Sequence, residues 1–135
     1  MPYTIAAEQD VLCFSMPADA DLDTTSYQFY IACIDSTDYT IKVASDADST
    51  TEPPIGVIYD KPTAKWQPCL VAYSGIARVM AGGVIAAGDA VTCNASGLAI
   101  ATTTAGDKCI GRAVSVGASG AIVFVLMGMF MYEAT

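Results

Sequence analysis

The side chains that most often carry out catalysis are poorly represented in this chain. Histidine is absent from the 135 residues, and serine or cysteine nucleophiles normally depend on a histidine as their base. A serine–lysine pair could replace it, with Ser74 or Ser96 as the nucleophile and Lys65 or Lys108 as the base. However, the Ser-x-x-Lys spacing of such enzymes does not occur. We therefore expect no enzymatic activity and no cofactor.

The acidic residues do not form a recognisable metal site either. Asp19, Asp21 and Asp23 lie at alternate positions, but an EF-hand loop needs glycine at its sixth position and glutamate at its twelfth. Counted from Asp19, those positions hold Thr24 and Tyr30. The other acids lie beside prolines and serines, which is typical of solvent-exposed loops rather than of glycosidase acid pairs. Without histidine or a Cys-x-x-Cys pair, a zinc site is not expected.

The stretch from Ser74 to Ile100 consists of short apolar runs interrupted by glycine. Neither a GxGxxG nor a GxxxxGK[ST] phosphate-binding sequence occurs. The AAGDAV sequence is typical of biotinyl and lipoyl carrier domains, but the hairpin tip at residues 93–97 lacks the lysine that a carrier modifies. We therefore predict that the glycines shape tight turns. The glycines with this structural role are Gly75, Gly83, Gly88, Gly97 and Gly111.

The composition is apolar for a protein of this size. Hydrophobic residues make up 53% of the chain and charged residues 15%, so we expect a partner to cover part of the apolar surface. No run reaches the roughly 18 to 20 apolar residues that span a bilayer, and the N-terminal residues include no basic region of an export signal. We expect no membrane association and synthesis in the cytoplasm of a host cell.

Charge is distributed unevenly along the chain. The net charge is −8; residues 1–60 hold eleven of the fourteen acids and one base, Lys42, which gives −10. Residues 61–135 hold three acids and five bases, which gives +2. These five bases are scattered, and nothing in the acidic half could replace the counterions of phosphates. Nucleic acid is therefore not expected to be a direct partner.

The five cysteines have wide and irregular spacing. We interpret them as small, buried, reduced apolar residues rather than as disulfide or metal ligands. They are Cys13, Cys33, Cys69, Cys93 and Cys109.

Short β-forming runs separated by turn residues recur along the whole chain. They predict an all-β fold, a small β-sandwich or barrel of about eight to ten short strands with an extended N-terminal segment. We divide the chain into an N-terminal arm (1–25), a β domain (26–127) and an apolar C-terminal tail (128–135). The runs that we expect to form strands are 27–34, 39–43, 56–59, 66–74, 76–80, 84–85, 90–93, 109–116 and 121–127.

The order of motifs in the second half resembles that of the capsid decoration, or head cement, proteins of tailed bacteriophages. The resemblance covers most of residues 17–127 and includes the ADADLDTTSYQFY lead-in at residues 18–30. It departs at Lys65 and Asn94, where the family usually has glycine and aspartate. The segments that carry it are GVIYDKP (56–62), VAYSGIARV (71–79), AGGVIAAGDAV (81–91), ASG (95–97), AGD (105–107) and IGRA (110–113).

The resemblance implies a structural role on a virion. Members of this family form small β folds, often trimers, that bind the outside of an expanded icosahedral shell over the junctions between major capsid protein subunits. For this chain it therefore implies the major capsid protein as a partner, a homotrimer and location on the capsid surface. High apolar content and low charge suit a chain that is buried in a homo-oligomer and on a lattice.

Apolar residues near both ends are our predicted intersubunit or shell-facing interface, because methionine-rich ends adapt well to partner surfaces. The acidic loop 44–53 and the tract 19–25 face either solvent or basic patches of the capsid. An alternative is a virion β-barrel that recognises a receptor or glycan through a groove near Trp66, Tyr59 and Tyr73. The predicted interface residues are Met127, Met129, Phe130, Met131, Tyr132, Tyr3 and Phe14.

Overall fold

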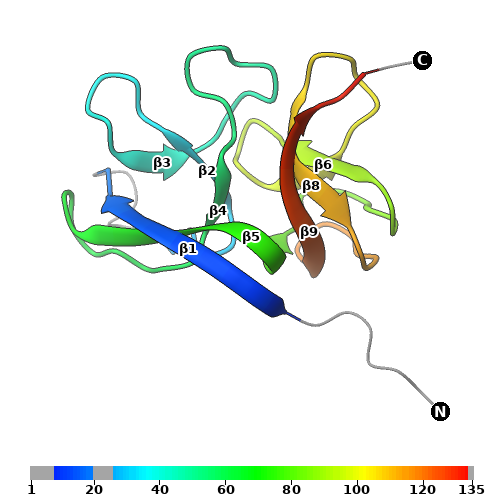
Figure 1. Ribbon diagram of the computed structural model, residues 1–135, viewed down its shortest axis with the longest axis horizontal. Coiled ribbons are helices and arrows are strands. Elements are labelled where there is room, and N and C mark those ends of the chain that lie inside the picture. Colours follow the sequence, from blue (N-terminus) through cyan, green and yellow to red (C-terminus); the bar gives the residue numbers. More distant parts are fainter. Residues whose placement is uncertain (1–7, 20–25, 134–135) are drawn as a thin grey trace.

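The computed structural model describes residues 8–19 and 26–133. This part of the chain forms nine β-strands and contains no α-helix, which confirms the predicted all-β fold. The strands build one antiparallel sheet that curls into a half-barrel (Figure 1). They are β1 (Gln9–Pro17), β2 (Ile31–Ile34), β3 (Ile41–Val43), β4 (Gly56–Ile58), β5 (Pro68–Met80), β6 (Ala90–Cys93), β7 (Ala99–Ala101), β8 (Lys108–Ala113) and β9 (Ile122–Met131).

The strand order is β3-β2-β4-β5-β9-β8-β6-β7, and β1 also pairs with β5. The part of the sheet formed by β2 and β4 is buried on both faces, because one apolar core lies on each side of it. In β2, Ile31 and Cys33 face the larger core, and Ala32 faces the smaller one. This explains why β2 and β4 are uninterrupted apolar runs rather than alternating ones.

β5 is the longest strand and joins the two halves of the sheet. We predicted a turn at Gly75, but Gly75 lies inside β5 with φ +88°, where it bends the strand instead of ending it. A Cβ atom there would collide with the backbone oxygen of Asp10 in β1. The pairing of β1 with β5 is irregular at the same place, between Gln9 and Cys13. The glycine therefore permits a close approach of two strands.

Two further strand boundaries differ from the prediction by four residues. The strand expected to begin at Tyr27 begins at Ile31, because residues 28–30 form a turn in which Phe29 has φ +73°. The strand expected to end at Met127 continues to Met131, since β8 still pairs with it at Lys108 and Cys109. Residues 128–131, which we assigned to a tail, are thus part of the sheet.

Four cysteines are buried as predicted, but Cys13 is exposed on β1 and was wrongly predicted to be buried. All five are free thiols. Burial raises the pKa of Cys33, Cys69 and Cys109 to about 11, and that of Cys93 to about 12. These four thiols are protonated and unreactive at neutral pH.

Candidate interaction surface

The two faces of β9 differ in what they contact. Val123 and Val125 have no exposed surface and Met127 is 9% exposed, because all three point into the larger core. Phe124 and Leu126 alternate with them and point away from the core, and Leu126 is 53% exposed. Residues i and i+2 of a strand share a face, so this outward row reflects the geometry of the strand.

The neighbouring strands extend this outward row across the sheet. Leu126 lies between Ile76 of β5 and Arg112 of β8, and Phe124 lies opposite Arg78 of β5. These residues lie on three adjacent strands, and their side chains are exposed or half-buried. We call this surface the outer face; it consists of Ile76, Arg78, Arg112, Phe124 and Leu126, together with Phe130, over which the Arg112 guanidinium lies.

Within residues 8–19 and 26–133, Arg78 of the outer face forms a salt bridge with Glu8, whereas Arg112 forms none. The guanidinium of Arg112 lies 5.1 Å from the ring centroid of Phe130, and its Nη1 donates to the backbone oxygen of Gly88 at 3.1 Å. Arg78 Nε lies 3.8 Å from a carboxylate oxygen of Glu8. Arginine and aromatic side chains are enriched in the core of protein–protein interfaces, and the outer face combines both.

A hydrogen-bond network holds the start of β1 beside the outer face. The Tyr59 hydroxyl donates to Glu8 at 2.6 Å and accepts a hydrogen bond from the backbone N–H of Arg78, also at 2.6 Å. Burial and the bond to Glu8 raise the pKa of Tyr59 well above its ordinary value, so its hydroxyl keeps its proton. Tyr59 thus links the start of β1 to β5. In Figure 1 the start of β1 extends beyond the ends of β5 and β9.

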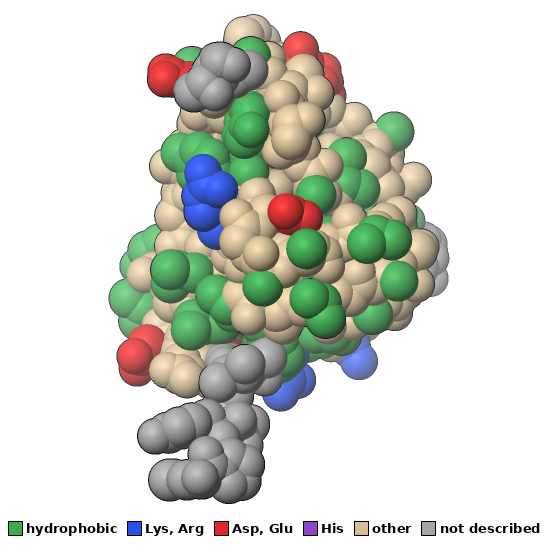
Figure 2. Space-filling model, turned by 90° about the vertical axis from the view of Figure 1, so that its right-hand side faces the viewer, with side chains coloured by type: hydrophobic (Ala, Val, Ile, Leu, Met, Phe, Trp, Pro, Cys, Tyr) green, Lys and Arg blue, Asp and Glu red, His purple; other side chains and the backbone are tan. Residues whose placement is uncertain are grey.

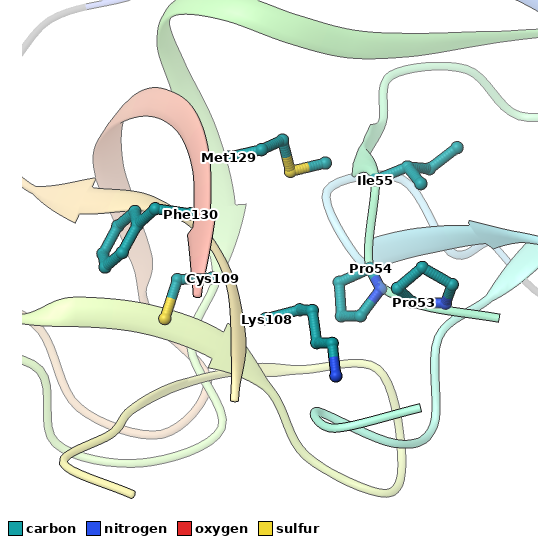
Figure 3. Close-up of a pocket in the computed structure, with 7 residues that line it drawn as sticks. All are labelled: Pro53, Pro54, Ile55, Lys108, Cys109, Met129 and Phe130. Carbon is teal, nitrogen blue, oxygen red and sulfur yellow. The ribbon is translucent and has the colours of Figure 1, made fainter. Parts of the chain in front are cut away.

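A shallow apolar cavity of about 340 Å³ lies between the end of β9 and the segment before β4. Met129 extends toward the segment that carries Ile55, whereas the Phe130 ring points in the opposite direction (Figure 3). Its lining includes the stem of Lys108, whose Nζ donates to the backbone oxygen of Asp48. The lining residues are Pro53, Pro54, Ile55, Lys108, Cys109, Met129 and Phe130.

The predicted interface residues do not form one surface. Met127 is buried in the core and offers nothing to a partner, so its assignment to the interface is wrong. Met129 and Met131 are about half exposed, at 48% and 53%. The backbone of Tyr132 is hydrogen-bonded to Gly106 and Asp107, Phe14 is half-buried with its ring 5.8 Å from that of Tyr73, and Tyr3 lies outside the described residues.

Sequence reasoning missed Leu126, Arg78 and Arg112. The two arginines are far apart in the sequence, and that separation gives no sign that they share a surface. Leu126 belongs to the predicted strand 121–127, whose residues are all apolar. Only the register Arg78↔Phe124 and Arg112↔Leu126 brings them together. The signal available in the sequence was the isolated arginine in each of the short apolar runs IARV and IGRA.

The aromatic residues of the alternative glycan-binding prediction also lie apart from the cavity. The Tyr59 hydroxyl is occupied by Glu8 and Arg78. Trp66 and Tyr73 are 59% and 45% exposed, and neither lines the cavity.

Part of the acidic loop is neutralised within the chain. Lys42 lies 2.9 Å from Glu52 and 3.6 Å from Asp35. Hydrogen bonds from the backbone N–H groups of Asp38 and Thr37 lower the pKa of Asp35. A side-chain hydrogen bond to Asp46, together with the repulsion between the two carboxylates, raises the pKa of Asp48. The tract 19–25 lies outside the described residues except for Asp19.

The five glycines with a predicted structural role occupy different settings. Gly88 and Gly97 lie in turns with φ +91° and +80°, and Gly83 lies in the loop after β5. Gly111 lies inside β8, where a Cβ atom would collide with the backbone oxygen of Leu126. Gly111 therefore allows β8 and β9 to pair closely beneath the outer face.

The part of the chain that the structure describes contains no helix long and apolar enough to cross a membrane. Residues 8–19 and 26–133 likewise contain no cluster of three histidine, cysteine, aspartate or glutamate side chains that could hold a metal ion.

A family model described as phage cement protein matches residues 33–129. The chain belongs to the phage cement protein family. The predicted resemblance to capsid decoration proteins is thereby confirmed, and this cement protein is a structural component of the virion located on the capsid.

A solved structure described as the head fiber gp8.5 N base in bacteriophage phi29 shares the fold of this cement protein. The TM-score is 0.61 with 18% sequence identity, over 87% of this chain and 95% of the other. A comparison with curated proteins finds no match.

Proposed function

We propose that this cement protein binds the outer surface of the icosahedral shell through its outer face, at junctions between major capsid protein subunits. The observation that carries the proposal is the outer face itself, where Arg78 and Arg112 flank the exposed Leu126 on three adjacent strands. A surface of this composition fits a partner with an apolar depression bordered by carboxylates. The major capsid protein is the partner that membership of a cement family suggests.

We further propose that the protein acts as a homotrimer. Three copies that bind together gain avidity, because the second and third contacts form at high effective concentration once the first has formed. A ligand that binds the assembled shell and not its free subunits stabilises the shell by mass action. A modest contact per copy is therefore sufficient to reinforce the capsid without any chemical reaction.

The test measures binding of purified protein to undecorated capsids, with Arg112→Glu compared against Lys61→Glu. Each substitution changes the charge by the same amount, but Lys61 is exposed in the segment after β4 and is not part of the outer face. We expect Arg112→Glu to weaken binding at least tenfold, because it replaces an attractive charge with a repulsive one at the contact. Lys61→Glu should change binding less than about twofold. Equal effects of the two substitutions would rule out the outer face as the binding surface.

A further inference from the structure

Two loops on the side of the molecule shown in Figure 2 form a single ordered surface. Residues 81–88 follow β5, residues 114–121 follow β8, and Ile85 and Gly117 exchange backbone hydrogen bonds of 2.9 and 3.0 Å. Ala81 is bonded in the same way to Gly120 and Ala121, at 2.9 and 2.8 Å. We call these two loops the loop platform. Its backbone is held by hydrogen bonds like those between paired strands. The two loops therefore have little conformational entropy left to lose when a partner binds.

The loop platform is apolar and exposed. Val84 and Val116 are 79% and 70% exposed, and Val84 is the most exposed of the large hydrophobic side chains that the structure describes. Their neighbours Ala86, Ala87 and Ala118 are also exposed. Neither loop contains a charged residue. On this side of the molecule, hydrophobic side chains are spread among uncharged groups, and charged groups are few (Figure 2).

Asp89, the nearest acid in the sequence, is directed back into the first loop, where it accepts a hydrogen bond from the backbone N–H of Ala86 at 2.8 Å. An exposed apolar surface of this kind is a feature of protein contact sites. The small alanine and glycine side chains would allow the backbone of a partner to approach closely.

The charge distribution of the chain favours a second copy of the same chain as the partner of the loop platform. Each copy carries a net charge of −8, so two copies repel each other over most of their surfaces. The acids are concentrated in residues 1–60, whereas the loop platform has no charge to repel a second platform. The outer face, by contrast, presents two arginines and would place like charges together if two copies met through it. The loop platform is thus the surface on which contact between identical copies has the lowest electrostatic cost.

We infer that the loop platform is the contact between copies in the homo-oligomer, and that Val84 and Val116 are its apolar anchors. The inference rests on the proposed homotrimer and assigns its contact surface. Arg112 joins the loop platform to the outer face. Its guanidinium donates a hydrogen bond to the backbone oxygen of Gly88 at the end of the first loop, and it lies over Phe130 of the outer face. Contact through the loop platform would leave the outer face free for the shell.

The test measures the mass of the full chain in solution by native mass spectrometry and sedimentation. We expect the unmodified protein to have the mass of three chains and the double variant Val84→Lys/Val116→Lys to have the mass of one. The matched control is Leu12→Lys/Leu70→Lys, which adds the same two charges at exposed leucines of β1 and β5 and should leave the mass unchanged. Thermal unfolding of each variant verifies that it is folded, and Val84→Ile/Val116→Ile should keep the oligomer.

An oligomer that persists in the folded double variant would overturn the inference, as would a single-chain mass for the unmodified protein. Capsid binding of Leu126→Asp separates this outcome from that of the proposed function, because Leu126 belongs to the outer face and not to the loop platform. If the loop platform is not the copy contact, the folded double variant keeps both its mass and its avidity for capsids. If the outer face is not the shell contact, Leu126→Asp binds capsids normally whatever its mass.

Discussion

The two faces of β9 carry equally apolar side chains but surround them with different neighbours. Val123 and Val125 are enclosed by aliphatic and alanine side chains of the larger core. Phe124 and Leu126, one position along, have arginines as cross-strand partners. Hydrophobicity alone therefore does not separate a core residue from an interface residue in this strand. What separates them is the side chain opposite, which the pairing register determines.

The largest effect is expected from an aspartate on the inner face of β9. Val125→Asp would place a carboxylate at a fully buried position with no partner for its charge, a change that costs several kcal/mol and can exceed the whole stability of a small domain. We expect the variant to lose cooperative thermal unfolding. A Val125→Asp variant that melts near the temperature of the unmodified protein would contradict the placement of this side chain in the core.

The same substitution one residue later should affect binding instead of folding. Leu126→Asp lies on the exposed outer face, where a substitution usually changes stability by less than about 0.5 kcal/mol. It would place an acid in the proposed contact with the shell, so we expect at least tenfold weaker binding to capsids. Melting curves and capsid co-sedimentation measure the two effects separately. Unchanged co-sedimentation would remove Leu126 from the contact surface.

A smaller effect is expected where Tyr59 attaches β1 to the sheet. Tyr59→Phe removes the hydrogen bonds to Glu8 and to the backbone of Arg78, and each typically contributes about 0.5 to 1.5 kcal/mol. We expect a loss of about 1 to 2 kcal/mol in chemical denaturation. Hydrogen exchange should show the largest loss of protection in β1. A uniform loss over all strands would instead indicate that Tyr59 supports the whole core.

The smallest effect near neutral pH is expected from the thiols of the core. The pKa values of Cys33, Cys69 and Cys109 are about 11 in the folded chain, against 9.0 for an ordinary thiol. The folded state therefore keeps protons that the unfolded chain releases above pH 9. The contribution of these thiols to the free energy of unfolding is complete below pH 9 and declines as the pH rises toward 11.

Chemical denaturation under reducing conditions, repeated at pH values between 9 and 11, measures this decline in the free energy of unfolding.

A thiol reagent at pH 7.5 should modify Cys13 alone in the folded protein and all five cysteines in denaturant. Rapid labelling of more than one cysteine in the folded state would show that the core is open to solvent.

The sequence was sufficient to predict the all-β class and the family, because turn residues and short β-forming runs are local features. The bend at Gly75 could not be predicted, since it depends on the approach of Asp10, which lies far away in the sequence. The extension of β9 depends in the same way on its pairing with β8.

Of the residues in the outer face, the predicted interface included only Phe130. The methionine-rich end contains the exposed Met129 and Met131, but the pattern also included Met127, which the sheet buries. Arg78 and Arg112 become neighbours of one surface only through the register of three strands.

The most direct test of the proposed shell contact is a cryo-electron microscopy map of capsids decorated with this cement protein. The account predicts density over the junctions between capsid subunits, with Arg78, Arg112 and Leu126 of each copy in contact with the shell. It also predicts that copies touch one another through residues 81–88 and 114–121. A map in which the outer face points away from the shell, toward solvent, would contradict it.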